Sequence, residues 1–157
     1  FWREHADSAS YDFFHAPGQA LPTWWTLAPH DSAHLVGWAG GPGALALGGL
    51  DARGVLDAAL ATLARLFSRP RTALLAELES WRVQDWQREP FTRGGYCVVP
   101  VGALPQLEVL GEPVEHTLFF AGEALAPAGQ AGTVPGALAS GREVAERLLR
   151  TRPGAGR

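Results

Sequence analysis

Lysine and methionine are absent from this sequence, and cysteine occurs only once, at Cys97. Without lysine, the chain has no side-chain amine for Schiff-base or general-base chemistry, so a lysine-dependent step would need another chain. A single cysteine excludes an internal disulfide and a cysteine cluster for zinc, and it indicates a reducing compartment, by default the cytoplasm. Because the chain begins at Phe1, we expect a fragment, a processed product or a trimmed protein.

Long apolar runs and excess positive charge are missing as well. No stretch approaches the ~18 uninterrupted apolar residues of a membrane span, and the polar start FWREHADSAS lacks a signal-peptide core. The net charge of −3 argues against a non-specific nucleic-acid binder. The five histidines show no metal-ligand spacing such as HxxxH. We therefore expect a soluble protein with no membrane, nucleic-acid or metal partner.

The first half of the chain contains strand and helix signals. The aromatic, proline-rich stretch 1–29 and residues 34–39 favour short antiparallel strands. Asp51 is a plausible helix N-cap, and the apolar residues that follow it up to Phe67 recur with the 3.6-residue period of a helix. Pro70 is expected to stop this helix.

The middle of the chain is less regular in pattern. Residues 73–86 fit neither a strand nor a helix cleanly, and we interpret them as a strand near its end. Residues 87–106 are rich in proline and glycine, which predicts a loop. A loop of this length inside a compact domain is more often functional than filler.

The segment 118–149 joins an apolar strand, a Gly122-Glu123 turn, a small-residue loop and an amphipathic helix capped by Thr133. Free backbone amides at the helix start, including that of Val134, suit a long anionic cofactor. Alternatively, the small residues only permit tight packing of the helix on a sheet. Glu123 is placed to accept hydrogen bonds from sugar hydroxyls, or it is a solvated turn residue or a cap.

Trp86 and Tyr96 bracket a glycine-rich loop. Flat rings in such a place can form a wall for a flat cofactor or an amine, although an aromatic core is the plainer interpretation for most of the tryptophans. Cys97 is interpreted as a small buried packing residue and not as a nucleophile.

Three blocks, in order, resemble the FAD-dependent amine oxidases, the monoamine and polyamine oxidase family. LFFAGEA followed by GTVPGALASGREVA resembles the ending of that family, and WQREPFTRGGY resembles its "W..DP…GsY" block. LVGWAGGPGA with the helix after Asp51 resembles a further block. Together the three blocks cover most of the chain, which is far more specific than a lone glycine motif.

The resemblance implies an α/β fold: the C-terminal part of a two-domain, Rossmann-like FAD-binding protein of the glutathione-reductase type. Residues 1–40 would be the tail of the substrate-binding domain. Residues 41–150 would be the C-terminal portion of the FAD-binding domain with an inserted helix at 51–67, and 151–157 a disordered tail.

The resemblance also implies the site residues. The FAD contacts would be made by seven residues: Trp86, Gly122, Glu123, Ala124, Gly132, Thr133 and Val134. Glu123 would accept a bond from a sugar-alcohol hydroxyl, and the Val134 amide would face the pyrimidine end of the flavin ring. Tyr96, Thr133 and Trp86 would border the amine, with Thr133 in place of a second aromatic cage wall. The resemblance assigns no catalytic acid or base within this chain.

The reaction implied is oxidation of an amine to an imine by non-covalent FAD, with dioxygen as the acceptor. Covalent attachment is not expected, because Cys97 follows Tyr96 whereas the attaching cysteine of monoamine oxidases precedes it. The GxGxxG turn for the ADP moiety is absent from these residues. We therefore expect a missing N-terminal half as partner and a fragment that is inactive alone.

Two alternatives remain open. One is a related flavoprotein of the desaturase or protoporphyrinogen oxidase type. The other is a non-catalytic truncated fragment.

Overall fold

A computed structural model describes residues 1–3 and 11–151 of the chain. Its contacts divide the protein into two compact units, Phe1–Gln87 and Arg88–Arg157. The division falls after residue 87 and not after residue 40, because the helix that follows Asp51 packs on the preceding strands. The assignment of 1–40 and 41–150 to substrate and FAD domains stays a prediction. The predicted tail lies outside the described residues, apart from Thr151.

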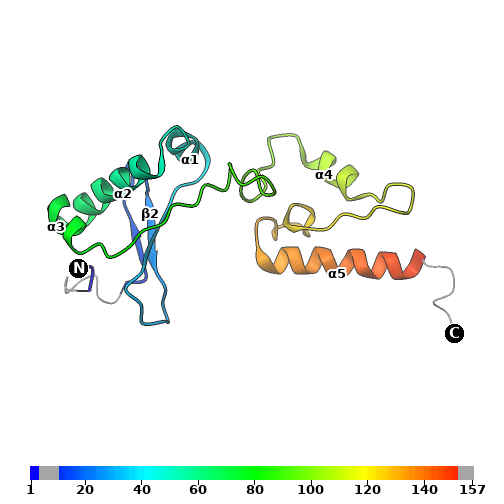
Figure 1. Ribbon diagram of the computed structural model, residues 1–157. Coiled ribbons are helices and arrows are strands. Elements are labelled where there is room, and N and C mark those ends of the chain that lie inside the picture. The colour runs from blue at the N-terminus through cyan, green and yellow to red at the C-terminus, as the bar shows by residue number, and fades with distance from the viewer. Residues whose placement is uncertain (4–10, 152–157) are drawn as a thin grey trace. The chain divides into compact units, whose positions relative to one another are not determined.

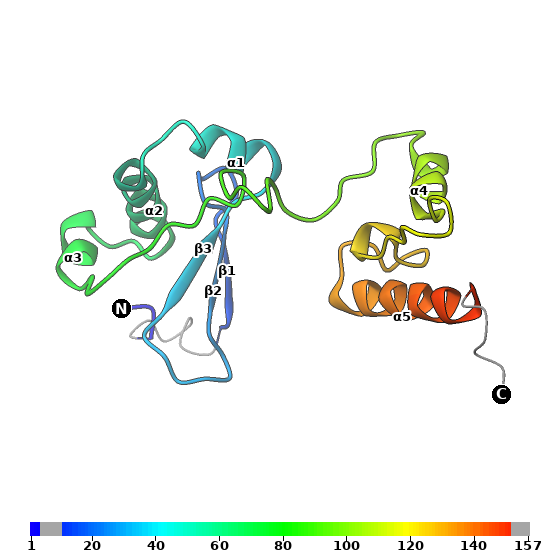
Figure 2. The ribbon, with the colours of Figure 1, turned by 45° about the vertical axis from the view of Figure 1, so that its right-hand side comes forward.

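The first unit contains a three-stranded antiparallel sheet, seen side on in Figure 2. Its strands are β1 (Phe13–His15), β2 (Thr23–Thr26) and β3 (Leu35–Trp38), in the order β1-β2-β3. The prediction of short antiparallel strands is confirmed for these three segments, whereas residues 4–10 of the same stretch lie outside the described chain.

Trp24 fixes the register of β2 against β3. It pairs with Gly37, and a Cβ atom built at Gly37 would lie 2.6 Å from the Trp24 ring, so only glycine leaves room for the buried indole. The indole N–H donates to the carbonyl of Leu21 at 2.8 Å, which satisfies the buried polar atom of this side chain.

Helix α2 (Ala52–Leu66) packs on the sheet, and its start is as predicted. The Asp51 carboxylate accepts a hydrogen bond from the Gly54 N–H at 2.7 Å, which is N-cap geometry. Leu56, Leu60 and Leu63 are buried at helical spacing. The helix ends at Leu66, before Pro70 is reached.

The hydrophobic core of the chain lies in this first unit. The ring of Phe67 packs edge to face on those of Phe1 and Phe14, with centroids 5.2 and 5.1 Å apart. Such edge-to-face pairs are preferred by aromatic quadrupoles. The cluster of buried residues consists of Phe14, Leu21, Trp24, Leu56, Leu60, Leu63, Phe67 and Leu74.

Two short helices in this unit differ from the predictions. Helix α1 (Gly41–Leu47) lies where no element was expected, and the glycine and proline of this segment suit the first turn of a helix. The strand predicted within residues 73–86 is wrong: α3 (Arg71–Ala76) begins after Pro70, and irregular chain follows it. Leu74 is buried against α2, so the apolar residues of α3 pack one side of a helix and not a pleated sheet.

The second unit contains α4 (Leu104–Gly111), the 3-10 turn η1 (Glu123–Leu125) and α5 (Val134–Thr151). Figure 1 shows η1 between α4 and α5, and both helices contact it. The predicted loop 87–106 is irregular up to residue 103, but its last residues begin α4. The helix predicted after Thr133 is confirmed.

The strand predicted at 118–121 is wrong for this chain. Leu118 forms only an isolated antiparallel bridge with Val114, and the three residues after it have no regular structure. A strand requires a neighbour for its backbone groups, and the described part of the second unit offers none.

Helix α5 buries only Gly136 and Ser140. Several of its larger apolar side chains are exposed, with Val134 at 74% and Leu138 at 71% of full accessibility. No other described residue of the second unit is buried. This unit therefore has a long helix whose apolar face is uncovered within the described chain.

Candidate functional site

Glu123, the first residue of η1, lies at the centre of the candidate site. One carboxylate oxygen accepts the backbone N–H of Cys97 at 2.6 Å, and the other accepts the backbone N–H of Gly132 at 2.6 Å. The Cys97 thiol also donates to this second oxygen, at 3.1 Å. The side chain therefore joins segments that lie 26 and 9 residues away in the sequence.

These contacts shift both ionisable groups. The thiol hydrogen bond from Cys97, followed by the Cys97 backbone N–H, lowers the pKa of Glu123, because both donors favour the charged carboxylate. The same hydrogen bond to Glu123 raises the pKa of Cys97, and desolvation and the carboxylate charge add to the rise. These contacts thus favour the ionised form of Glu123 and the neutral thiol form of Cys97.

Thr133 caps helix α5, as predicted. Its hydroxyl oxygen accepts the Gly136 N–H at 3.0 Å and donates to the Gln130 carbonyl at 2.7 Å. The Ala137 N–H reaches the Thr133 carbonyl at 3.0 Å. Pro135 has no N–H, so the amide of Val134 is the first-turn donor left without an acceptor among the described residues.

Gly136 and Ser140 hold the loop and the turn against α5. A Cβ atom at Gly136 would lie 2.1 Å from the Gln130 carbonyl oxygen, so this position needs glycine. Ser140 is 2% exposed, and its hydroxyl oxygen accepts the Gly122 N–H at 3.2 Å. The small-residue pattern of α5 pointed to close packing at Gly136, but the pairing of Ser140 with Gly122 had no signal in the sequence.

The structure brings most of the predicted site residues into one unit. One group lies at the η1 turn: Gly122, Glu123 and Ala124. The other group lies at the start of α5 and just before it: Gly132, Thr133 and Val134. The hydrogen bond from the Gly132 N–H to the Glu123 carboxylate joins the two groups.

Tyr96 belongs to the same unit, next to Cys97, and its ring is 58% exposed. Trp86 is 57% exposed and belongs to the first unit, so it is not brought to Glu123 within one unit. Cys97 is half-buried and hydrogen-bonded, which corrects its interpretation as a buried packing residue.

The residues at this site fit a long ligand that carries hydroxyl and anionic groups. FAD is such a ligand. The Val134 N–H is a free donor at the positive end of an 18-residue helix. Cβ atoms built at Gly122, Gly129 and Gly132 would meet nothing within 4 Å, so the backbone here is open to close approach. The ionised Glu123 carboxylate can accept about four bonds, of which three are used.

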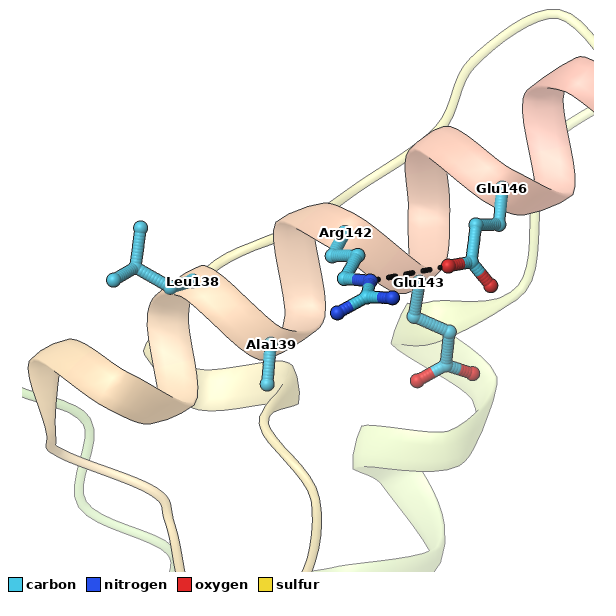
Figure 3. A pocket seen from close by; sticks show the side chains of 5 residues that line it. All are labelled: Leu138, Ala139, Arg142, Glu143 and Glu146. Atoms are coloured by element: carbon cyan, nitrogen blue, oxygen red, sulfur yellow. Dashed lines mark hydrogen bonds and ion pairs between the residues drawn. The ribbon is translucent and has the colours of Figure 1, made fainter.

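A shallow depression on α5 is a separate feature. Figure 3 shows Arg142 and Glu146 paired across one helical turn, with the Arg142 Nε donating to Glu146 at 3.2 Å. The lining comes from α5 alone: Leu138, Ala139, Arg142, Glu143 and Glu146. An exposed i,i+4 pair on one helix explains it, and it does not adjoin Glu123.

No group of three or more His, Cys, Asp or Glu side chains in residues 1–3 and 11–151 is placed to hold a metal ion. No described helix is both long enough and apolar enough to cross a membrane.

Residues 1–149 match the family described as flavin containing amine oxidoreductase. The chain belongs to that family. The resemblance inferred from the three sequence blocks is thereby confirmed.

Solved structures and a curated relative agree with this membership. Putrescine oxidase bound to putrescine is 25% identical, with a TM-score of 0.76 over 96% of this chain and 32% of that enzyme. A variant from the redesign of its cofactor binding has a TM-score of 0.77 at 24% identity, over 97% of this chain and 33% of the variant.

Lysine-specific histone demethylase 1 homolog 3 of Arabidopsis thaliana is 41% identical over 68 residues, which are 43% of this chain and 4% of that protein. The chain thus spans about a third of the solved enzyme and a small part of the curated relative. The fold is that of part of a flavin amine oxidase.

Proposed function

We propose that these residues take part in the oxidation of a small amine to an imine by non-covalently bound FAD, with dioxygen as the acceptor, as part of a longer chain or a complex. Family membership and the likeness to putrescine oxidase support amine oxidation in general. FAD, when bound, supplies the electron-accepting chemistry, and the protein supplies binding and orientation.

One observation carries the proposal: the free Val134 N–H opens α5 beside a glycine-lined loop whose Gly132 is tied to Glu123. We assign the Val134 amide to the pyrimidine end of the flavin ring, where a positive helix end favours negative charge by roughly 0.3–2 kcal/mol. We assign the remaining acceptor position of Glu123 to a sugar-alcohol hydroxyl. Gly122, Ala124 and Gly132 would let the backbone approach the cofactor.

The amine would be bordered by Tyr96, whose exposed ring offers an apolar face, and by Trp86 beside the flavin. Thr133 stands where a second aromatic wall would be. Its hydroxyl donates to Gln130 and accepts from Gly136, and we assign the substrate contact of Thr133 to its methyl group. No acid or base of this chain is assigned to the chemical step.

Non-covalent binding is supported by the state of Cys97. Its thiol is bonded to Glu123 and its pKa is raised, so a thiolate for attachment to the flavin is disfavoured at neutral pH. The one cysteine, unpaired, supports a reducing cytoplasmic location.

The partner proposed is an N-terminal half that carries the GxGxxG turn. The exposed apolar face of α5, with Val134 and Leu138, and the lack of buried apolar side chains in the described part of the second unit support such a partner. Alone, the chain would bind FAD weakly and be inactive.

The test compares the 157-residue chain with the longer protein that carries it, each loaded with FAD and separated from free flavin by gel filtration. We expect one flavin per longer protein, retained little by the 157-residue chain, and peroxide release from the longer protein with a panel of mono-, di- and polyamines. A longer protein that retains flavin but oxidises none of these amines contradicts amine oxidation. A longer protein that retains no flavin contradicts the proposal as a whole.

A further inference from the structure

The Glu123 side chain ties together the two segments that carry the proposed substrate wall and flavin contact. Its two backbone bonds, from Cys97 and Gly132, are both 2.6 Å long. Hydrogen bonds to an ionised acceptor are shorter and about twice as strong as bonds between neutral groups. The contact with the Cys97 thiol, at 3.1 Å, adds a third donor.

Both bonded amides are adjacent to a proposed site residue. The Cys97 N–H belongs to the planar peptide group that joins Tyr96 to Cys97, so fixing this N–H fixes the orientation of the backbone at Tyr96. Gly132 lies two residues before Val134 and has a left-handed φ of 73°, a conformation that glycine adopts without strain. Its bond to Glu123 therefore helps to aim the first turn of α5.

We propose that Glu123 is a positioning residue, which sets the placement of the Tyr96 loop relative to the amide of Val134, and that the Cys97 thiol serves as its hydrogen-bond donor. The inference rests on the proposed function for the roles of Tyr96 and Val134. The three contacts themselves concern only this chain, and they can be tested without flavin.

Residue type fits this role. An ionised carboxylate is an acceptor only, so it can take all three donors at once, whereas an amide side chain keeps one acceptor oxygen and adds an N–H₂ donor. A thiol at residue 97 supplies a donor that alanine lacks and that serine retains.

The first experiment measures amide hydrogen exchange by NMR in the full 157-residue chain and in its Glu123→Gln variant. The Gln side chain cannot accept both amides, so exchange at Cys97 or Gly132 should speed up by about tenfold or more, the factor expected for losing a bond to a charged acceptor. The Gly136 amide, bonded to Thr133, should keep its rate. Glu143→Gln, on the exposed face of α5, is the matched control.

The second experiment follows alkylation of Cys97 across pH, which is site-specific because the chain has one cysteine. Glu123→Gln should move the profile to lower pH and speed alkylation several-fold at pH 8, because the thiolate no longer faces a carboxylate. Glu143→Gln should leave the profile in place. A Glu123 side chain that did not contact the Cys97 thiol would leave this profile in place.

A third measurement covers the case in which Glu123→Gln fails to fold. The Glu123 carboxyl is titrated by carbon NMR in Cys97→Ala and Cys97→Ser. Loss of the thiol donor should raise the pKa of Glu123 in Cys97→Ala, and serine should restore it. Unchanged amide exchange and alkylation in a folded Glu123→Gln chain, or an unchanged Glu123 titration in Cys97→Ala, overturns the proposal. If the contacts of Glu123 with Cys97 and Gly132 are confirmed but the longer protein retains no flavin, only the proposed function fails.

Discussion

Gly136→Ala is the substitution whose effect on α5 follows most directly from the geometry. The added methyl group would lie 2.1 Å from the Gln130 carbonyl oxygen and 2.8 Å from the Ala126 Cβ. Both atoms belong to the loop that leads to Thr133. Because a backbone carbonyl cannot turn aside as a flexible side chain can, the whole loop must move.

The expected change in the free energy of unfolding of Gly136→Ala is the difference of two terms. Restoring an ordinary contact requires a displacement of about 1 Å in a packed loop, and such overpacking typically costs about 1–3 kcal/mol. Alanine in a helix interior is favoured over glycine by about 0.8–1 kcal/mol. The variant should therefore be less stable, by up to about 2 kcal/mol. Gly141 provides the control, because a Cβ atom there would meet nothing within 4 Å. Gly141→Ala should be more stable, by up to about 1 kcal/mol.

The assay is urea unfolding of the full chain followed by circular dichroism, with residue-level hydrogen exchange in α5 to report the second unit. The two glycine substitutions on one helix should change the free energy of unfolding in opposite directions. If Gly136→Ala stabilises α5 as Gly141→Ala does, the close approach of Gln130 to the helix is not present in the protein. Faster exchange at the Gly132 amide in Gly136→Ala should accompany the loss of stability.

Three further predictions concern other contacts. Thr133→Ala removes the cap bond to Gly136 and should destabilise α5 by about 1 kcal/mol, measured by helix exchange rates, whereas Thr133→Ser should retain most of the stability. Leu60→Ala removes a buried side chain of α2 and should lower the free energy of unfolding of the first unit by about 2–5 kcal/mol. Hydrogen exchange in α5 is the internal control. The pKa of Glu123 is lowered, so its stabilisation is present above the unfolded value of about 4.3 and is lost as pH falls through the folded pKa. The pKa of Cys97 is raised, so its stabilisation is present below about 8.5 and is lost as pH rises through the folded pKa. Stability of the second unit should thus be greatest between about pH 5 and 8, and Glu123→Gln should flatten the profile at both ends.

Local signals predicted the parts of the fold that local chemistry determines. Asp51 and Thr133 cap their helices as their residue types indicated, because an N-cap bond spans only three residues. The strand at β3 was likewise predicted from apolar and aromatic residues bounded by glycine. These elements need little information from the rest of the chain.

The errors fall where distant partners decide the structure. The apolar run at 118–121 has strand composition, but a strand forms only beside another strand. Pro105 was included in the loop predicted from proline and glycine, whereas it lies in the first turn of α4.

The contact between Cys97 and Glu123 shows the same limit at the candidate site. It joins residues 26 apart and had no periodic or motif signal. The resemblance named Glu123, but only the three-dimensional structure shows that its carboxylate accepts a hydrogen bond from the Cys97 thiol.

The central claim, that the start of α5 faces the flavin, is tested most directly by the midpoint potential of flavin bound to the longer protein in a Val134→Pro variant. Proline is well tolerated at the first helical position and Thr133 remains free to cap, so the substitution removes the N–H with little other change. Val134→Ala, which keeps the N–H, is the control. Loss of a bond to a charged group, about 1.5–3 kcal/mol, should lower the two-electron potential by about 30–65 mV. Equal potentials in both variants and the unsubstituted protein would contradict the assignment of the Val134 amide.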